Sequence, residues 1–235
     1  MSRCRCAIAL VMLGVLAHAQ SAWADPIKLL QTAEGLYLSE SWEHAARLLD
    51  QALAEIKAAA AKRPKDEPVP ADEARTRRRV LYLLADAQRR AGEAKPALEN
   101  SIAYFNELRQ LTSSDAKNLQ REYADVLADD YLRLKKFKES HLLLSEKLKG
   151  RYGPLKTIPK LDVLVRIAAI EERMEQPRQA RGRWMEAEKL AVELLQKHGK
   201  HLAPDERELC EKYLELSRRA LEPQPESVEE PERKT

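Results

Sequence analysis

The chain has 235 residues, of which 44% are hydrophobic, 34% are charged and 5% are aromatic. Its mean hydropathy of −0.56 excludes a polytopic membrane protein, while the apolar share is large enough to build a core rather than a disordered chain. The formal net charge of +3 gives no reason to expect a nucleic-acid partner. Only seven glycines and few aromatic residues, beside abundant Ala, Leu, Glu, Lys and Arg, favour an all-α fold.

Residues 1–24 are predicted to be a signal peptide. Two early arginines precede an apolar stretch at residues 7–17, and small residues then stand at the positions up to Ala24 that a signal peptidase reads. The apolar stretch is too short to cross about 30 Å of hydrocarbon as a helix. An N-terminal anchor or a buried helix is the alternative. Cleavage after Ala24 predicts a periplasmic or secreted protein that starts at Asp25 and has no stable membrane span.

The chain from residue 26 to residue 221 shows the apolar period of helices and no convincing alternation of strands. Proline, glycine and capping residues make long breaks at residues 62–70, 111–115, 150–154 and 199–204. Shorter breaks fall at residues 40–41, 92–93, 135–136 and 176–177. Because long and short breaks alternate, we predict four helical hairpins followed by a closing helix from Pro204 to Leu221.

Aligning the short breaks reveals a repeat. A small residue near the end of each first helix is followed twelve residues later by a small residue early in the second helix, as in Ala33/Ala45, Ala85/Ala97, Ala128/Ser140 and Ala168/Ala180. Two helices that cross near their shared turn need small side chains at the contact point. The units begin 52, 43 and 40 residues apart, and such periods indicate a solenoid. An irregular α-bundle in which alanine is merely common is the alternative.

These units resemble the tetratricopeptide repeat (TPR) family. The resemblance is clearest at residues 84–105 (LADAQRRAGEAKPALENSIAYF) and 127–148 (LADDYLRLKKFKESHLLLSEKL), followed by residues 33–53. The period is longer than the standard one, and the tyrosine expected in the first helix is kept only at Tyr131. The resemblance implies a TPR-like domain at residues 25–221: an α-solenoid of about four stacked helical hairpins and a C-terminal capping helix, with the first helices lining a concave face.

The first helices supply the candidate binding residues. Charged side chains that turn away from the hairpin contact can bind a peptide through charge-assisted hydrogen bonds, and a tyrosine can anchor it. For each residue, a merely solvated polar face is the alternative. The candidates are Tyr82, Asp86, Arg89, Arg90, Glu122, Asp125, Asp129, Arg133, Glu172 and Arg173. Family members that clamp a C-terminal carboxylate use Lys and Asn where this chain has Leu30, Glu34 and Leu83, so the resemblance does not imply that mode.

Other features offer little chemistry. The sequence has no Gly-rich phosphate loop, no Gly-x-Ser-x-Gly and no His-Glu-x-x-His motif, so we expect no cofactor, no metal and no catalytic residue. His198 and His201 lack an evident third metal ligand and are expected to face water. Cys210, the one cysteine after residue 24, is expected to be buried and inert. The arginines at residues 75–79 could meet an acidic envelope polymer or an acidic patch of a partner.

The sequence therefore predicts an exported, non-catalytic scaffold that binds a peptide segment or an envelope protein on the concave face. Extended repeat surfaces suit chains better than small molecules. The first alternative is an enzyme or small-ligand binder whose site follows no motif. The second is an adaptor that oligomerises through its ends, which the charged closing helix disfavours. The sequence does not predict an oligomeric state, and residues 222–235 are expected to form a disordered tail.

Overall fold

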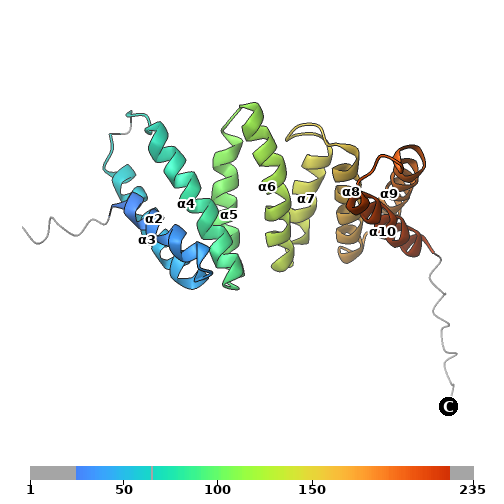
Figure 1. The fold of residues 1–235 in the computed structure, drawn as a ribbon, viewed down its shortest axis with the longest axis horizontal. Helices are drawn as coiled ribbons and strands as arrows, with labels where there is room; N and C mark the ends of the chain where they lie inside the picture. The colour runs from blue at the N-terminus through green and yellow to red at the C-terminus, as the bar shows by residue number, and fades with distance from the viewer. Residues whose placement is uncertain (1–24, 65, 223–235) are drawn as a thin grey trace, which may run out of the picture. The chain divides into compact units, whose positions relative to one another are not determined.

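The computed structural model describes residues 25–64 and 66–222 (Figure 1). Within those ranges the chain forms nine α-helices and no β-strand, which confirms the predicted all-α helical repeat fold. The predicted signal peptide and residues 223–235 of the predicted tail lie outside the described residues. The helices are α2 (Pro26–Leu38), α3 (Trp42–Ala61), α4 (Ala71–Arg90), α5 (Ala94–Arg109), α6 (Ser114–Arg133), α7 (Phe137–Leu148), α8 (Thr157–Arg173), α9 (Pro177–His198) and α10 (Pro204–Leu221).

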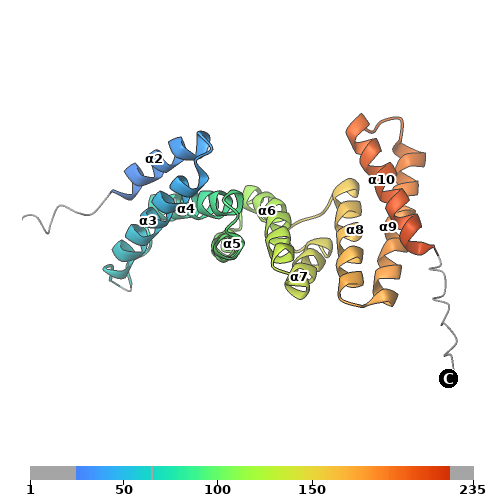
Figure 2. The same cartoon turned by 90° about the horizontal axis from the view of Figure 1, so that it is seen from below.

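The helices divide into two compact units, one up to Gln110 and one from Leu111. In the first unit, α2 packs against α3, α3 against α4, and α4 against α5. In the second unit, α6 packs against α7 and α7 against α8, while α8, α9 and α10 lie against one another (Figure 2). The pairs α2/α3, α4/α5, α6/α7 and α8/α9 are the four predicted hairpins, and α10 is the predicted closing helix.

The small-residue pairs lie in the interior of each hairpin, as predicted. Both members of every pair are at most 2% exposed. In the third hairpin the contact is close enough for the Ser140 hydroxyl to donate to the Ala128 carbonyl oxygen over 3.0 Å. Larger apolar side chains such as Leu49, Leu164 and Trp184 fill the space further from the turn. The repeat found in the sequence therefore reflects the point where the two helices of a hairpin approach most closely.

The four short turns share one backbone geometry. Each has one left-handed residue, seven positions after the small residue of the first helix: Glu40, Gly92, Lys135 and Glu175, with φ of 60°, 83°, 57° and 57°. The next amide donates to a carbonyl oxygen five residues back, for example from Ser41 to Leu36 and from Lys136 to Tyr131, both over 2.9 Å. This is the Schellman ending of a helix, which reverses the chain into the second helix.

This shared turn predicts opposite effects for two substitutions. A side chain at Gly92 would meet no atom within 4 Å, so Gly92→Ala is expected to cost only the strain of a left-handed alanine, about 1 kcal/mol of unfolding free energy. Lys135→Gly should relieve such strain and raise the unfolding free energy by about 0.5–1 kcal/mol. Urea denaturation of residues 25–235 measures both. A loss of stability in Lys135→Gly would contradict the shared geometry.

Two features predicted from the sequence, a helix cap and a buried cysteine, lie in the first and last helices of the second unit. The Ser113 hydroxyl accepts a hydrogen bond from the Ala116 amide (3.2 Å) and caps α6. Cys210 of α10 is buried as expected, and burial raises the pKa of its thiol, which keeps the thiol protonated and unreactive. In the described part of the chain, no helix is both long and apolar enough to cross a membrane.

Candidate interaction surfaces on the first helices

In the first unit, Asp86 of α4 is the centre of a polar cluster. Its carboxylate accepts hydrogen bonds from the Tyr37 hydroxyl of α2, from Arg89 (2.7 Å) and from Arg90 (2.7 Å). Burial opposes ionisation of Asp86, but these hydrogen bonds and the two arginine charges outweigh it and hold the pKa of the carboxyl below its usual value. Burial and the same carboxylate raise the pKa of Tyr37 to about 12. Asp86 therefore joins α2 to α4 as an anion at neutral pH.

Aromatic rings surround this cluster. The Arg90 guanidinium lies over the Trp42 ring, 4.7 Å from its centroid, and 5.8 Å from the Tyr37 centroid. Tyr37 and Trp42 meet edge to face with their centroids 4.8 Å apart. Tyr82 is 45% exposed and lies beside Tyr104, at 5.5 Å between centroids. Arg90 thus has internal contacts as well as exposed surface, since cation–π contacts of this kind hold the side chain in place.

Internal ion pairs involve most of the basic cluster at residues 75–79. Arg77 pairs with Glu107 (2.7 Å), and Arg79 pairs with Glu34 of α2 (2.5 Å). Arg75 lies 3.8 Å from Asp72. Arg77 is thus held inside the first unit, whereas Arg75 and Arg79 keep 78% and 64% of their side chains exposed, so the ion pairs explain part of the cluster as a structural feature.

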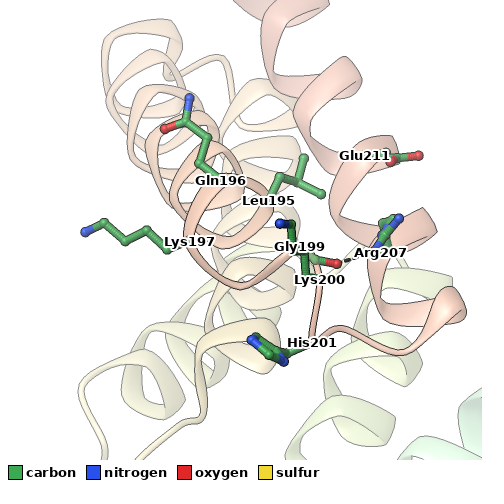
Figure 3. A pocket seen from close by; sticks show the side chains of 8 residues that line it. All are labelled: Leu195, Gln196, Lys197, Gly199, Lys200, His201, Arg207 and Glu211. Atoms are coloured by element: carbon green, nitrogen blue, oxygen red, sulfur yellow. Dashed lines mark hydrogen bonds between the residues drawn. The ribbon is translucent and has the colours of Figure 1, made fainter.

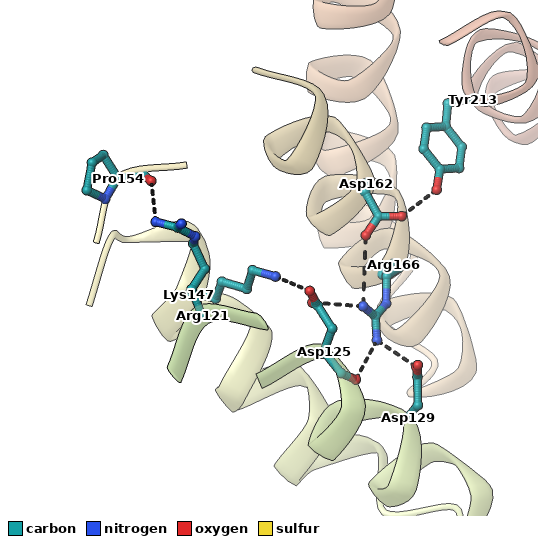
Figure 4. A network of polar contacts seen from close by, with 8 residues as sticks. All are labelled: Arg121, Asp125, Asp129, Lys147, Pro154, Asp162, Arg166 and Tyr213. Carbon is teal, nitrogen blue, oxygen red and sulfur yellow. Dashed lines mark hydrogen bonds and ion pairs between the residues drawn. The ribbon is translucent and has the colours of Figure 1, made fainter. Parts of the chain in front are cut away.

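In the second unit, Arg166 of α8 gathers three carboxylates (Figure 4). Its guanidinium donates to Asp125 (2.9 Å) and Asp129 (2.6 Å) of α6, and it lies 3.8 Å from Asp162 of its own helix. It also donates to the backbone carbonyl oxygen of Asp125. Arg166 therefore joins the first helices of two successive hairpins, α6 and α8.

The network extends to the neighbouring helices. Lys147 of α7, only 4% exposed, donates to Asp125, and Tyr213 of α10 donates to Asp162. Burial raises the pKa of the Asp129 carboxyl, and Arg166 opposes that rise only in part. Asp129 still keeps 58% of its side chain exposed. Of the three carboxylates around Arg166, Asp129 is thus the most accessible to a partner.

The remaining predicted residues differ in orientation. Glu122, Arg133 and Arg173 are exposed, and Arg173 lies 5.9 Å from the Phe137 ring centroid. Arg89 and Glu172, contrary to expectation, contact the second helices of their own hairpins, although Glu172 is also exposed. Arg89 is 13% exposed and donates to Ser101 of α5 (3.2 Å), while Glu172 accepts from the Trp184 indole of α9 (2.7 Å). Both contacts span twelve residues, the same offset as the small-residue pairs, so this position of the repeat faces the second helix.

Three predicted residues occupy one position of the repeat. Arg90, Arg133 and Arg173 each stand five residues after the small residue and end a first helix. Cations near a helix C-terminus are favoured by the helix dipole, which is a structural reason for them. Their exposure also makes them the most regular set of outward cations on the first helices.

Sequence reasoning missed Arg166, Asp162, Lys147, Tyr37 and Trp42, which complete the two clusters. One signal for Arg166 was present. It stands two residues before the small residue of its hairpin, where the second and third units have the apolar residues Leu83 and Val126 and the first unit has Gln31. Arg166 is the one charged residue at this repeat position, and such a charge indicates an ion pair with a neighbouring helix. The tyrosine, tryptophan and lysine carried no comparable signal.

The second unit has hollows at α9–α10 and between α6 and α8. The α9–α10 hollow, of about 600 Å³, is lined by the connecting loop, Arg207 and Glu211. In it, Arg207 donates to the Gly199 carbonyl oxygen, while Gln196, Lys197 and Glu211 point in different directions (Figure 3). The second hollow, here the α6–α8 pocket, has a volume of about 510 Å³ and is lined by Arg121, Glu122, Asp125, Lys147, Pro154, Leu155, Lys156 and Pro159. Among residues 25–64 and 66–222, no cluster of three His, Cys, Asp or Glu side chains could hold a metal ion.

The fold is similar to that of solved helical repeat proteins. A Podosopora anserina protein described as a kinesin light chain, with nearly identical TPR-like repeats, is 18% identical over 83% of this chain and 88% of its own, with a TM-score of 0.54. The apo form of RapI is 13% identical over 92% of this chain and 77% of its own, with a TM-score of 0.48. No protein-family model matches the sequence, and no curated protein matches it significantly. The first likeness and the described hairpins establish a TPR-like helical repeat fold.

Proposed function

We propose that this protein is an exported, non-catalytic scaffold that binds an extended segment of a partner protein along the first helices of its hairpins. The observation that carries the proposal is the row of side chains on α6. Glu122, Asp125, Asp129 and Arg133 fall within about 80° of one another at 100° per residue. The neighbouring first helix, α8, is joined to this row through Arg166. A charged row between adjacent first helices suits an extended chain with its own charges.

Pull-down from envelope extract tests this proposal. Residues 25–235 carrying both Arg133→Glu and Arg173→Glu are expected to lose most of a partner that the unchanged protein recovers, because two equivalent exposed cations become anions. These residues are better targets than Arg89, since charge reversal there would remove the contacts to Asp86 and Ser101.

A matched control distinguishes a loss of binding on the first helices from a general effect of the changed net charge. Lys189→Glu with Lys212→Glu makes the same change in net charge on exposed residues of α9 and α10. This control should recover the partner as the unchanged protein does. Equal recovery by both double variants, at equal helix content by circular dichroism, would contradict binding along the first helices.

Export is a separate part of the proposal. The first described helix has its N-cap at Asp25, whose carboxylate accepts from the Ile27 amide (2.9 Å), and Asp25 is the residue that cleavage after Ala24 would leave at the N-terminus. N-terminal sequencing of the protein recovered from the periplasm or medium of a bacterial host tests this. A protein found only in the cytoplasm with residues 1–24 intact would refute export.

A further inference from the structure

The α6–α8 pocket combines an apolar wall with cations from three segments. Pro154, Leu155 and Pro159 belong to the α7–α8 connection and the start of α8, while Arg121, Lys147 and Lys156 come from α6, α7 and that connection. Its volume of about 510 Å³ falls in the range of about 300–1,000 Å³ that small ligands and anchoring side chains occupy. The pocket can therefore hold one or two side chains of a bound peptide.

The charges of the pocket are not balanced internally. Lys147 donates to Asp125, so these two neutralise each other. Arg121 donates only to neutral oxygens in the described part of the chain, namely Asn118 Oδ1 (2.9 Å) and the Pro154 carbonyl (3.3 Å, Figure 4). Lys156 is exposed and forms no ion pair with any described residue. Two cations thus face the pocket against one remaining anion, Glu122.

We propose that this pocket binds an acidic peptide segment, in which a carboxylate side chain meets Arg121 and Lys156 and an adjacent aliphatic side chain contacts Pro154, Leu155 and Pro159. The inference rests on the proposed scaffold function and names the chemistry of the bound segment. A carboxylate fits because a guanidinium with only neutral acceptors gains a charge-assisted hydrogen bond from it. The aliphatic neighbour fits because it removes apolar wall from water.

Glu122 gives the proposal a distinctive consequence. Its carboxylate lines the same pocket and repels an incoming carboxylate. Removing that charge with Glu122→Gln should therefore tighten binding of an acidic peptide by about two- to threefold. A pocket that bound a basic segment would instead bind that segment more weakly after Glu122→Gln.

Titration followed by amide NMR shifts provides the test. The probe is acetyl-Pro-Leu-Glu-Leu-Pro-amide, compared with the peptide in which Gln replaces Glu, and with hexanoate as a free aliphatic acid. The Glu peptide should shift amides of residues 121–125 and 155–160. The Gln peptide and hexanoate should bind at least about threefold more weakly, since the Gln peptide lacks the carboxylate and hexanoate does not hold its carboxylate and its alkyl chain as two neighbouring side chains.

Variants locate the contact. Lys156→Gln removes no described contact. Arg121→Gln removes the hydrogen bonds to Asn118 and Pro154. If Arg121→Gln perturbs the α7–α8 connection, Lys156→Gln still tests the contact. Each variant should lower the affinity for the Glu peptide by at least about threefold. Lys149→Gln, which changes an exposed lysine outside the pocket, should leave that affinity unchanged. Unchanged affinity in both pocket variants, or equal binding of the Gln peptide or hexanoate, would overturn the proposal.

The two proposals fail separately. A partner recovered in the pull-down and lost in Arg133→Glu/Arg173→Glu, beside no selective binding of the Glu peptide, would keep the scaffold and refute the acidic segment. Selective binding of the Glu peptide at residues 121–125 would support the pocket even if the envelope extract yields no partner.

Discussion

Replacing Trp184 by alanine is expected to lower the free energy of unfolding by about 3–5 kcal/mol, the largest effect we expect from one substitution in this chain. Trp184 is 5% exposed and belongs to the core cluster that joins α8, α9 and α10, with Leu161, Leu164 and Cys210. Alanine would leave a cavity where the three helices meet. It would also remove the hydrogen bond of the indole to Glu172. Urea or thermal denaturation followed by circular dichroism measures the loss.

Two further variants divide this effect into its parts. Trp184→Phe keeps most of the buried ring and removes the hydrogen bond, so the expected loss is about 1–2 kcal/mol. Met185→Ala, at the next position but 57% exposed, should change stability by no more than about 0.5 kcal/mol. If Trp184→Ala cost no more than Met185→Ala, the second unit would not depend on this core.

The elements of the fold were predictable because they follow local rules. Prolines and glycines mark the ends of helices in the sequence itself, and the small pairs such as Ala85/Ala97 recur at a fixed offset. The structure confirms the four hairpins and the closing helix within the described residues. Apolar residues that recur every 3.6 residues and small residues at a twelve-residue offset carry enough information to place such helices, since the two helices of each hairpin are neighbours in the sequence.

The candidate surfaces were predictable only in part. Asp125 and Asp129 were found because they lie on a first helix, but their partner Arg166 lies about 40 residues away on another hairpin. Such a contact depends on how helices distant in sequence pack, which periodicity does not encode. The contacts that Arg89 and Glu172 make with the second helices of their hairpins were missed for a related reason: long side chains near the turn reach across to the second helix.

Ala45→Leu is expected to lower the free energy of unfolding by about 1–3 kcal/mol, because it overpacks the closest contact of the first hairpin. Ala45 of α3 and its counterpart Ala33 of α2 are both 0% exposed. Leucine brings three more carbon atoms into a space that two methyl groups fill. The helices must separate or the side chain must leave its preferred rotamer. Urea denaturation of residues 25–235 measures the loss.

The same helix offers a control and a rescue. Ala54→Leu places leucine on the exposed side of α3, where it forms helix almost as well as alanine, and should change stability by no more than about 0.5 kcal/mol. Ala45→Ser should cost less than Ala45→Leu, because Ser140 occupies this position in the third hairpin and donates to the facing carbonyl oxygen. Equal stability of Ala45→Leu and Ala54→Leu would mean that the contact tolerates large residues. The repeated small residue would then be a compositional accident rather than the constraint that sets the spacing of every hairpin.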